Sequence, residues 1–183
     1  LIDQAHIVDE LFGVVNVPSG IWIDEDGIIV RPPEPAFAAR LAALDREIPA
    51  DASPDEAEQL RELKKLRIEP EKYVAALRDW VAHGAGSRYA LSPEEVLRRS
   101  RPRPIEEATA AAHFELAQYL YRGGHVEDAV AHFRAAHHLQ PYNWTYKRQA
   151  WKLDDGPTRH YEGDLFTDVK PIGFENFYPA LDM

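Results

Sequence analysis

The chain has 183 residues, of which 45% are hydrophobic and 10% aromatic, so it can build one domain or two small ones and is not disordered throughout. Its formal net charge of −10 argues against a nucleic acid or an anionic membrane surface as its partner. No stretch is long and apolar enough for a transmembrane helix, and no basic-then-apolar signal segment opens it. The lack of cysteine excludes disulfides, thiolate metal sites and thiol nucleophiles within these residues. With no disulfides to explain, the sequence leaves the redox compartment open, and a cytoplasmic location is the default expectation.

The first fifty residues predict a helix, a β-hairpin and a second helix. The first helix is expected to end at Phe12, before Gly13. Two apolar runs, residues 20–23 and 28–30, flank the sequence Asp24-Glu25-Asp26-Gly27, and an Asp-Gly pair between two β-forming runs is a strong hairpin signal. A closing helix over residues 35–48 is predicted from apolar residues three or four positions apart: Phe37, Leu41, Leu44 and Ile48.

The middle of the chain, residues 50–103, is predicted to consist of connecting helices. Two four-residue segments each combine an N-cap serine, a proline at the first helical position and a glutamate whose side chain can accept a hydrogen bond from the serine N–H. These segments are Ser53-Pro54-Asp55-Glu56 and Ser92-Pro93-Glu94-Glu95. Another helix is expected to follow Pro70 and to end near Gly84. The apolar faces of these helices are interpreted as core.

Residues 104–154 carry the most regular helical pattern. One helix is predicted from Pro104 to the pair Gly123-Gly124, and a second from Val126 to Leu139. The contact between these two helices, here called the seam, is expected to contain small residues that let the helices approach closely. Leu116 and Phe133 are expected to fill the seam. These small residues are Ala117, Ala129 and Ala136.

The spacing of this helical pair resembles one tetratricopeptide repeat (TPR). It departs from that pattern at His113, where a tryptophan is usual, and at Leu120, where a tyrosine is usual. Asn143 is expected to cap a further helix that includes Trp144 and Trp151. A solitary repeat cannot bury both of its faces, so it must pack on its own chain or on a partner. We therefore expect an interaction surface at His113, Leu120, Trp144 and Trp151, for a protein partner or a second copy.

The first 48 residues resemble the second half of a thioredoxin-like fold, in the order helix, Val-Pro, strand, Asp-Gly turn, strand and helix. The string Val17-Pro18-Ser19-Gly20-Ile21-Trp22-Ile23-Asp24-Glu25-Asp26-Gly27 is most similar to the redoxin and thiol-disulfide oxidoreductase branches. The resemblance implies that Pro18 is the cis-proline facing the catalytic thiols. It also implies that the backbone of Val17 pairs with an extended substrate segment.

The first half of that fold, with its Cys-x-x-Cys helix, has no counterpart here, so no catalytic residue can be assigned. One partner implied by the resemblance is the upstream half of the same thioredoxin-like domain. A two-stranded hairpin is marginal alone, and its open edge is expected to be completed. That upstream half, a second copy or the aromatic tail of this chain can complete it.

Other chemistry has little support in the sequence. Eight histidines are present, but no His-Glu-x-x-His pair occurs, so solvated or capping histidines are favoured over a metal site. The acidic turn at residues 24–26 is interpreted as an ordinary hairpin turn. No P-loop, Gly-x-Gly-x-x-Gly or Gly-x-Ser-x-Gly motif is present, and no cofactor is predicted.

The last segment, residues 155–183, has no helical or strand period but is rich in aromatic residues. So long a segment without structure is expected to pack on something. It can lie across the chain's own helices or be exchanged with a second subunit. Its large apolar residues are Tyr161, Phe166, Ile172, Phe174, Phe177 and Tyr178.

The sequence thus predicts a mostly α, α+β chain. Its expected segments are a partial thioredoxin-like fold over 1–49, connecting helices over 50–103, TPR-like helices over 104–154 and an extended tail over 155–183. Two function classes are consistent with this plan. One is the C-terminal part of a thiol-disulfide oxidoreductase or redoxin that is not catalytic by itself. The other is a non-catalytic interaction protein with a degenerate thioredoxin-like scaffold.

Overall fold

The computed structural model describes residues 3, 6–100, 102–153, 161 and 163–183. It confirms an α+β, mostly helical chain, and the described residues form one sheet of two antiparallel strands. The chain divides into two compact units, the first made of residues 1–17 and 100–164 and the second of residues 18–99 and 165–183. Both units are discontinuous in sequence and do not follow the four consecutive segments expected.

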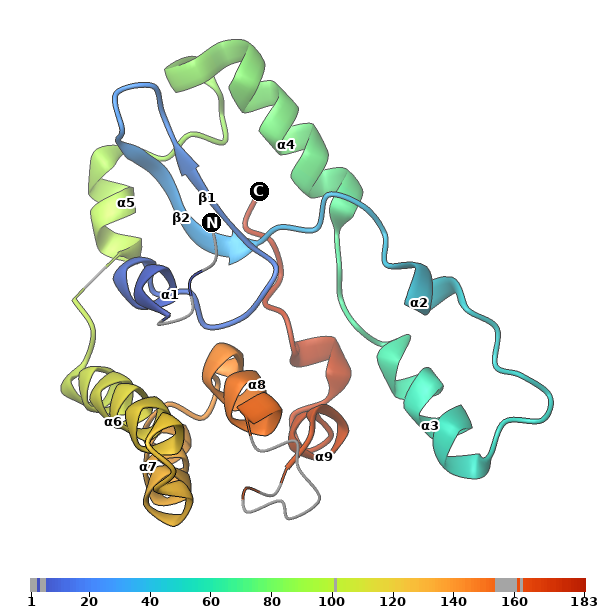
Figure 1. Ribbon diagram of the computed structural model, residues 1–183. Coiled ribbons are helices and arrows are strands. Elements are labelled where there is room, and N and C mark those ends of the chain that lie inside the picture. The colour runs from blue at the N-terminus through green and yellow to red at the C-terminus, as the bar shows by residue number, and fades with distance from the viewer. Residues whose placement is uncertain (1–2, 4–5, 101, 154–160, 162) are drawn as a thin grey trace. The chain divides into compact units, whose positions relative to one another are not determined.

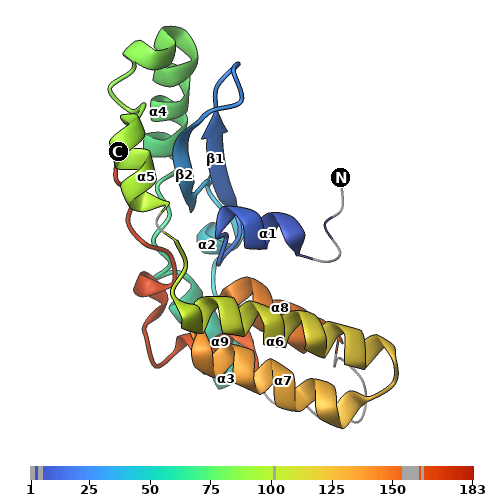
Figure 2. The same ribbon diagram turned by 90° about the vertical axis from the view of Figure 1, so that its left-hand side faces the viewer.

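The first unit contains α1 (Ile7–Phe12), α6 (Ile105–Arg122), α7 (Val126–Leu139) and α8 (Trp144–Leu153). The turn at residues 123–125 joins α6 to α7, which lie side by side in both views (Figures 1 and 2). Asn143 caps α8 as expected, because its Oδ1 accepts a hydrogen bond from the Tyr146 N–H at 3.1 Å.

The seam between α6 and α7 is built from alanine and aromatic side chains. The three alanines expected there, Ala117, Ala129 and Ala136, are fully buried, as is Phe133. Small side chains let the helix axes approach, and the aromatic rings fill the remaining space. Leu116 was wrongly placed in the seam: its side chain is 41% exposed on α6. Phe114, two positions earlier, takes the seam position and stacks on Tyr146 with ring centroids 4.0 Å apart.

The second unit contains the hairpin and most of the short helices. Its elements are β1 (Ser19–Ile23), β2 (Ile29–Pro35), α2 (Ala42–Asp45), α3 (Pro54–Leu63), α4 (Pro70–His83), a 3₁₀ turn (Gly84–Gly86), α5 (Pro93–Arg99), α9 (Leu165–Val169) and a second 3₁₀ turn (Phe174–Asn176). The Ser53 capping box is present, since Ser53 Oγ accepts from the Glu56 N–H and the Ser53 N–H donates to the Glu56 carboxylate.

The hairpin turns where the sequence predicted it. Asp24 Oδ1 accepts hydrogen bonds from the N–H groups of Asp26 and Ile28, at 3.1 and 2.8 Å. Gly27 adopts φ +80°, a left-handed conformation that glycine tolerates and most residues do not. The Asp-Gly pair therefore specifies this turn through a side-chain acceptor and a permissive backbone.

The helix expected over residues 35–48 is wrong. β2 continues through Pro35, and only the four residues of α2 are helical in this stretch. The apolar spacing is met by tertiary contacts instead, because Phe37 and Leu44 are both buried. Phe37 meets the ring of Tyr178 edge-on, with centroids 4.9 Å apart.

Helix α4 covers the hairpin in place of that expected helix (Figure 1). Trp22 of β1 is 2% exposed and stacks on Trp80 of α4, with ring centroids 5.0 Å apart. Tyr73, also on α4, lies at the other end of the contact and accepts a hydrogen bond from the Trp22 indole at 3.4 Å. The hairpin thus gains the second layer that an isolated pair of strands lacks.

The tail packs on the chain's own elements, which was one of the two arrangements expected. Tyr161 lies in the core of the first unit against Phe133, and Leu181 joins the Trp22 cluster of the second unit. The tail is not extended throughout, because α9 and a 3₁₀ turn form within it. Residues 154–160 and 162 of the expected tail and helical module lie outside the described residues.

Candidate functional site

The Val17-Pro18 segment lies directly before β1, which begins at Ser19. Val17 is 44% exposed, but its backbone is already engaged: its N–H donates to Asn16 Oδ1 at 2.9 Å and its carbonyl accepts from Arg148 at 3.4 Å. The Pro18 carbonyl accepts from the Ala36 N–H at 3.2 Å. A substrate segment that paired with Val17 would therefore have to displace hydrogen bonds within the chain.

Arg31 of β2 organises one side of the hairpin, and sequence reasoning missed it. This side chain is 2% exposed and forms a salt bridge with Glu34 at 2.6 Å. It donates 2.7 Å hydrogen bonds to two backbone carbonyls, those of Tyr89 and Asp182. A buried guanidinium needs acceptors such as these for its N–H groups. Arg31 lies opposite Trp22 in the β1–β2 register. No local sequence signal marks it as buried, because its carbonyl acceptors come from residues 89 and 182.

The tail and the loop before α5 cover the β2 side of the hairpin. The Val30 carbonyl accepts from the Leu91 N–H at 3.1 Å. Leu181 is held at both ends of its backbone, since its N–H donates to Glu69 at 3.0 Å and its carbonyl accepts from Lys72 at 2.6 Å. The backbone group that pairs with β2 here, the Leu91 N–H, comes from the loop before α5, which was not among the occupants expected for the hairpin edge. The tail contacts β2 through the Arg31 side chain instead.

Exposed apolar side chains concentrate near the N-terminal end of the sequence. Among the described residues, fourteen large hydrophobic side chains are exposed, and seven of them lie between residues 7 and 28. These seven are Ile7, Val8, Leu11, Val15, Val17, Ile23 and Ile28. Five of them belong to the first unit and two, Ile23 and Ile28, to the second. Scattered exposed apolar residues are ordinary, so it is their concentration in one stretch of the sequence that stands out.

The four residues expected to form an interaction surface on the helical module do not share one exposed face. Trp144 is 3% exposed, so it is not an accessible contact, which corrects the expectation. Leu120 and Trp151 are half-buried and pack against the α6–α7 core. His113 is half-buried and faces His132 of α7, with their Nδ1 atoms 2.7 Å apart. That distance requires one Nδ1 to carry a hydrogen and to donate a hydrogen bond to the other, unprotonated Nδ1.

A second histidine of α7 is buried. His137 is 7% exposed and its Nδ1 lies against the Tyr161 hydroxyl in the core. Burial disfavours the charged imidazolium and lowers the pKa of His137 to about 4. His137 is therefore neutral at physiological pH.

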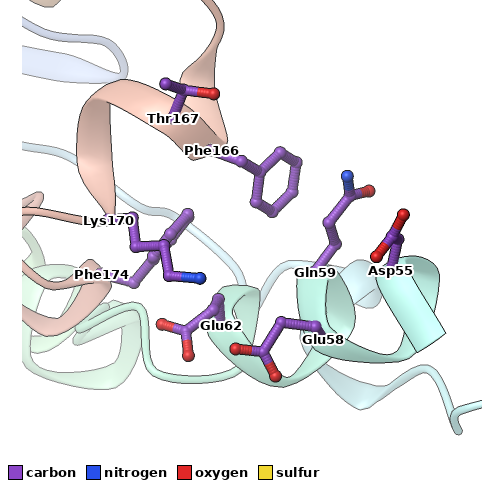
Figure 3. A pocket seen from close by; sticks show the side chains of 8 residues that line it. All are labelled: Asp55, Glu58, Gln59, Glu62, Phe166, Thr167, Lys170 and Phe174. Atoms are coloured by element: carbon purple, nitrogen blue, oxygen red, sulfur yellow. The ribbon is translucent and has the colours of Figure 1, made fainter.

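A shallow pocket lies between α3 and the tail in the second unit (Figure 3). Three carboxylates of α3, Asp55, Glu58 and Glu62, line one side. Phe166 and Lys170 line the other side (Figure 3). This arrangement joins an ordinary solvated acidic helix face to an aromatic side chain.

Neither a cluster of metal ligands nor a membrane-spanning helix is found in the part of the chain that the structure describes. No three His, Cys, Asp or Glu side chains converge there as metal ligands. None of the helices described there combines the length and the apolar composition needed to cross a membrane.

Searches for a matching protein family, for similar curated proteins and for similar solved structures found no match to this chain. Function is therefore inferred from the chain's own residues.

Proposed function

We propose that this chain is the C-terminal part of a thioredoxin-like thiol-disulfide oxidoreductase or redoxin, joined to a TPR-like interaction module. By itself it is not catalytic, because both disulfide reduction and thiol-dependent peroxide reduction begin with a thiolate and the chain has no cysteine. The element order from α1 through the Val17-Pro18 segment and the hairpin supports this proposal. The closing helix expected directly after the hairpin is not formed, and α4 covers the hairpin instead.

The exposed apolar stretch between residues 7 and 28 carries the proposal. In a thioredoxin-like domain the corresponding helix and hairpin pack on the first half of the fold, so these side chains would be buried by that half. Covering seven large side chains such as Leu11, which is 73% exposed, gives a favourable contribution of about 1 kcal/mol or more for each. The upstream half is therefore the partner that this stretch fits best.

The test is to read the coding sequence upstream of Leu1 and to express that segment joined to residues 1–183. The proposal expects a Cys-x-x-Cys or related redox pair in it, and reduction of insulin disulfides by the joined chain. Residues 1–183 alone should show no turnover above buffer. Pro18→Ala in the joined chain should lower turnover, whereas Pro179→Ala, at an exposed tail position, should leave it unchanged.

A joined chain without a redox pair or without turnover would instead support the second function, a non-catalytic interaction protein. The engaged backbone of Val17 favours that alternative, because a substrate segment has no vacant pair of hydrogen-bonding groups there. Hydrogen exchange separates the two further. Amides of residues 7–28 should exchange more slowly in the joined chain if the upstream half covers them.

A further inference from the structure

The outer face of α6 carries an apolar stripe that nothing in the described structure covers. The α6 stripe consists of Ile105, Ala108, Ala112, Leu116 and Tyr119, and all five are exposed. Ile105 and Tyr119 are 74% and 73% exposed. The stripe lies opposite the buried face of the helix, which packs on α7 and α8. A helix of an ordinary surface has polar residues on its solvent side, so this stripe marks an interface.

We propose that the α6 stripe binds the same stripe of a second copy, with the two helices antiparallel about a two-fold axis at Ala112. This inference goes beyond the proposed redox function and does not depend on it. A two-fold contact requires a surface that is complementary to itself. The α6 stripe meets this condition through the order of its large and small side chains.

Under that symmetry each residue faces the one equally far from Ala112 on the other copy. Leu116 faces Ala108 of the second copy, so a large side chain meets a small one on both sides of the axis. Ala112 faces its own equivalent, which allows the helices to cross closely. Ile105 faces Tyr119 at each end and closes the stripe over about 21 Å of helix.

Charge gives no reason to prefer an oppositely charged partner. Between positions 108 and 119 the one Asp, Glu, Lys or Arg side chain is Glu115, at the rim of the stripe. The two copies of Glu115 would lie about 9 Å apart along the direction of the helix axes. This separation is close to the screening length at physiological salt, so salt largely screens their repulsion. Five side chains from each copy bury on the order of 1,000 Å² in total, the lower limit for a specific interface. We therefore expect a reversible dimer with a micromolar to sub-millimolar dissociation constant.

The test is sedimentation equilibrium of residues 1–183 over a wide concentration range. Ala112→Glu should weaken self-association by about tenfold or more, because it buries charge at the axis. The matched control is Ala131→Glu, at an exposed position of α7 in the same unit, which should leave association unchanged. Both positions are exposed, so the helical circular dichroism and melting midpoint of each variant should match the parent.

A pair of variants tests the register itself. Ala108→Leu alone places two leucines opposite each other and should weaken association, as should Leu116→Ala alone, which leaves a gap. The double variant Ala108→Leu with Leu116→Ala restores one large and one small side chain at each contact and should recover the parent affinity. A chain that remains monomeric to about 1 mM, or a double variant that is no better than the single ones, overturns the proposal.

Discussion

At the scale of single residues, Gly20 shows how closely α4 lies against the hairpin. A Cβ at this position would lie 2.8 Å from the Ala36 Cβ and would also press on the Tyr73 hydroxyl. Glycine is therefore needed here for close approach, and the same approach lets Tyr73 reach the Trp22 indole.

We predict that Gly20→Ala lowers the free energy of unfolding of the second unit by about 1–3 kcal/mol through overpacking. Gly86→Ala is the control, because a Cβ there has no neighbour within 4 Å and the backbone is not left-handed. Calorimetric melting of both variants measures the difference. Equal midpoints for the two would mean that α4 does not lie this close to β1.

Burial of one histidine predicts a pH dependence in the first unit. The pKa of His137 is about 4 in the folded chain, below its ordinary value of 6.5. As the pH falls, the unfolded chain therefore takes up a proton at this histidine at a higher pH than the folded chain does. The stability that neutral His137 contributes is present above pH 6.5 and is lost as the pH falls toward 4. Between pH 7 and pH 5 the loss is roughly 2 kcal/mol.

Urea unfolding of His137→Gln at those two pH values measures this dependence. The variant should lose less stability on acidification than the parent, by roughly the same 2 kcal/mol. The adjacent His138 is exposed, so His138→Gln should keep the parent's pH dependence. If all three chains lose the same unfolding free energy between pH 7 and pH 5, His137 is accessible to protons in the folded state.

At the scale of elements, local signals in the sequence were sufficient wherever a cap or a turn fixed the backbone. The Ser53 capping box, Pro70 at the start of α4 and the Asp24 turn all formed where predicted. The helix over 35–48 failed because its apolar period reflected contacts distant in sequence, such as Phe37 with Tyr178. Periodicity shows which residues are buried but not what covers them.

The same limit explains the errors at the candidate sites. Leu116 and Phe114 are both apolar residues of α6, and their spacing does not say which one faces α7. Trp144 was expected on the surface because the repeat pattern leaves one face open, but the structure buries it. Arg31 could not be recognised as an anchor, since its acceptors come from residues 89 and 182.

The α6–α7 seam gives a prediction about the helical pair. Ala129→Leu should cost about 1–3 kcal/mol of unfolding free energy, because Ala129 is fully buried and a larger side chain forces the axes apart. Ala131→Leu lies on the exposed side of the same helix and should change stability by no more than about 0.5 kcal/mol. Thermal melting of both variants tests the packing. An unchanged midpoint for Ala129→Leu would remove the TPR-like assignment.

At the scale of the whole molecule, the tail contributes residues to the cores of both units: Tyr161 to the first and Leu181 to the second. Its contribution in the second unit comes mainly from backbone groups: Lys72 and Arg31 donate to the carbonyls of Leu181 and Asp182, and Glu69 accepts from the Leu181 N–H. The side chain of Leu181 also completes the cluster around Trp22. The last three residues are therefore a structural part of the hairpin rather than a loose end.

Removing residues 181–183 is predicted to destabilise the second unit by about 2–4 kcal/mol. The buried Arg31 guanidinium loses one carbonyl acceptor, and the Trp22 cluster loses an apolar side chain. Asp182→Ala is the matched control, since it keeps the carbonyl and removes only a 75% exposed carboxylate paired with Arg99, so it should cost less than about 1 kcal/mol. Calorimetry of both chains distinguishes the backbone contribution from the ion pair. A truncated chain that melts with the parent would show that water replaces the tail at Arg31 without cost.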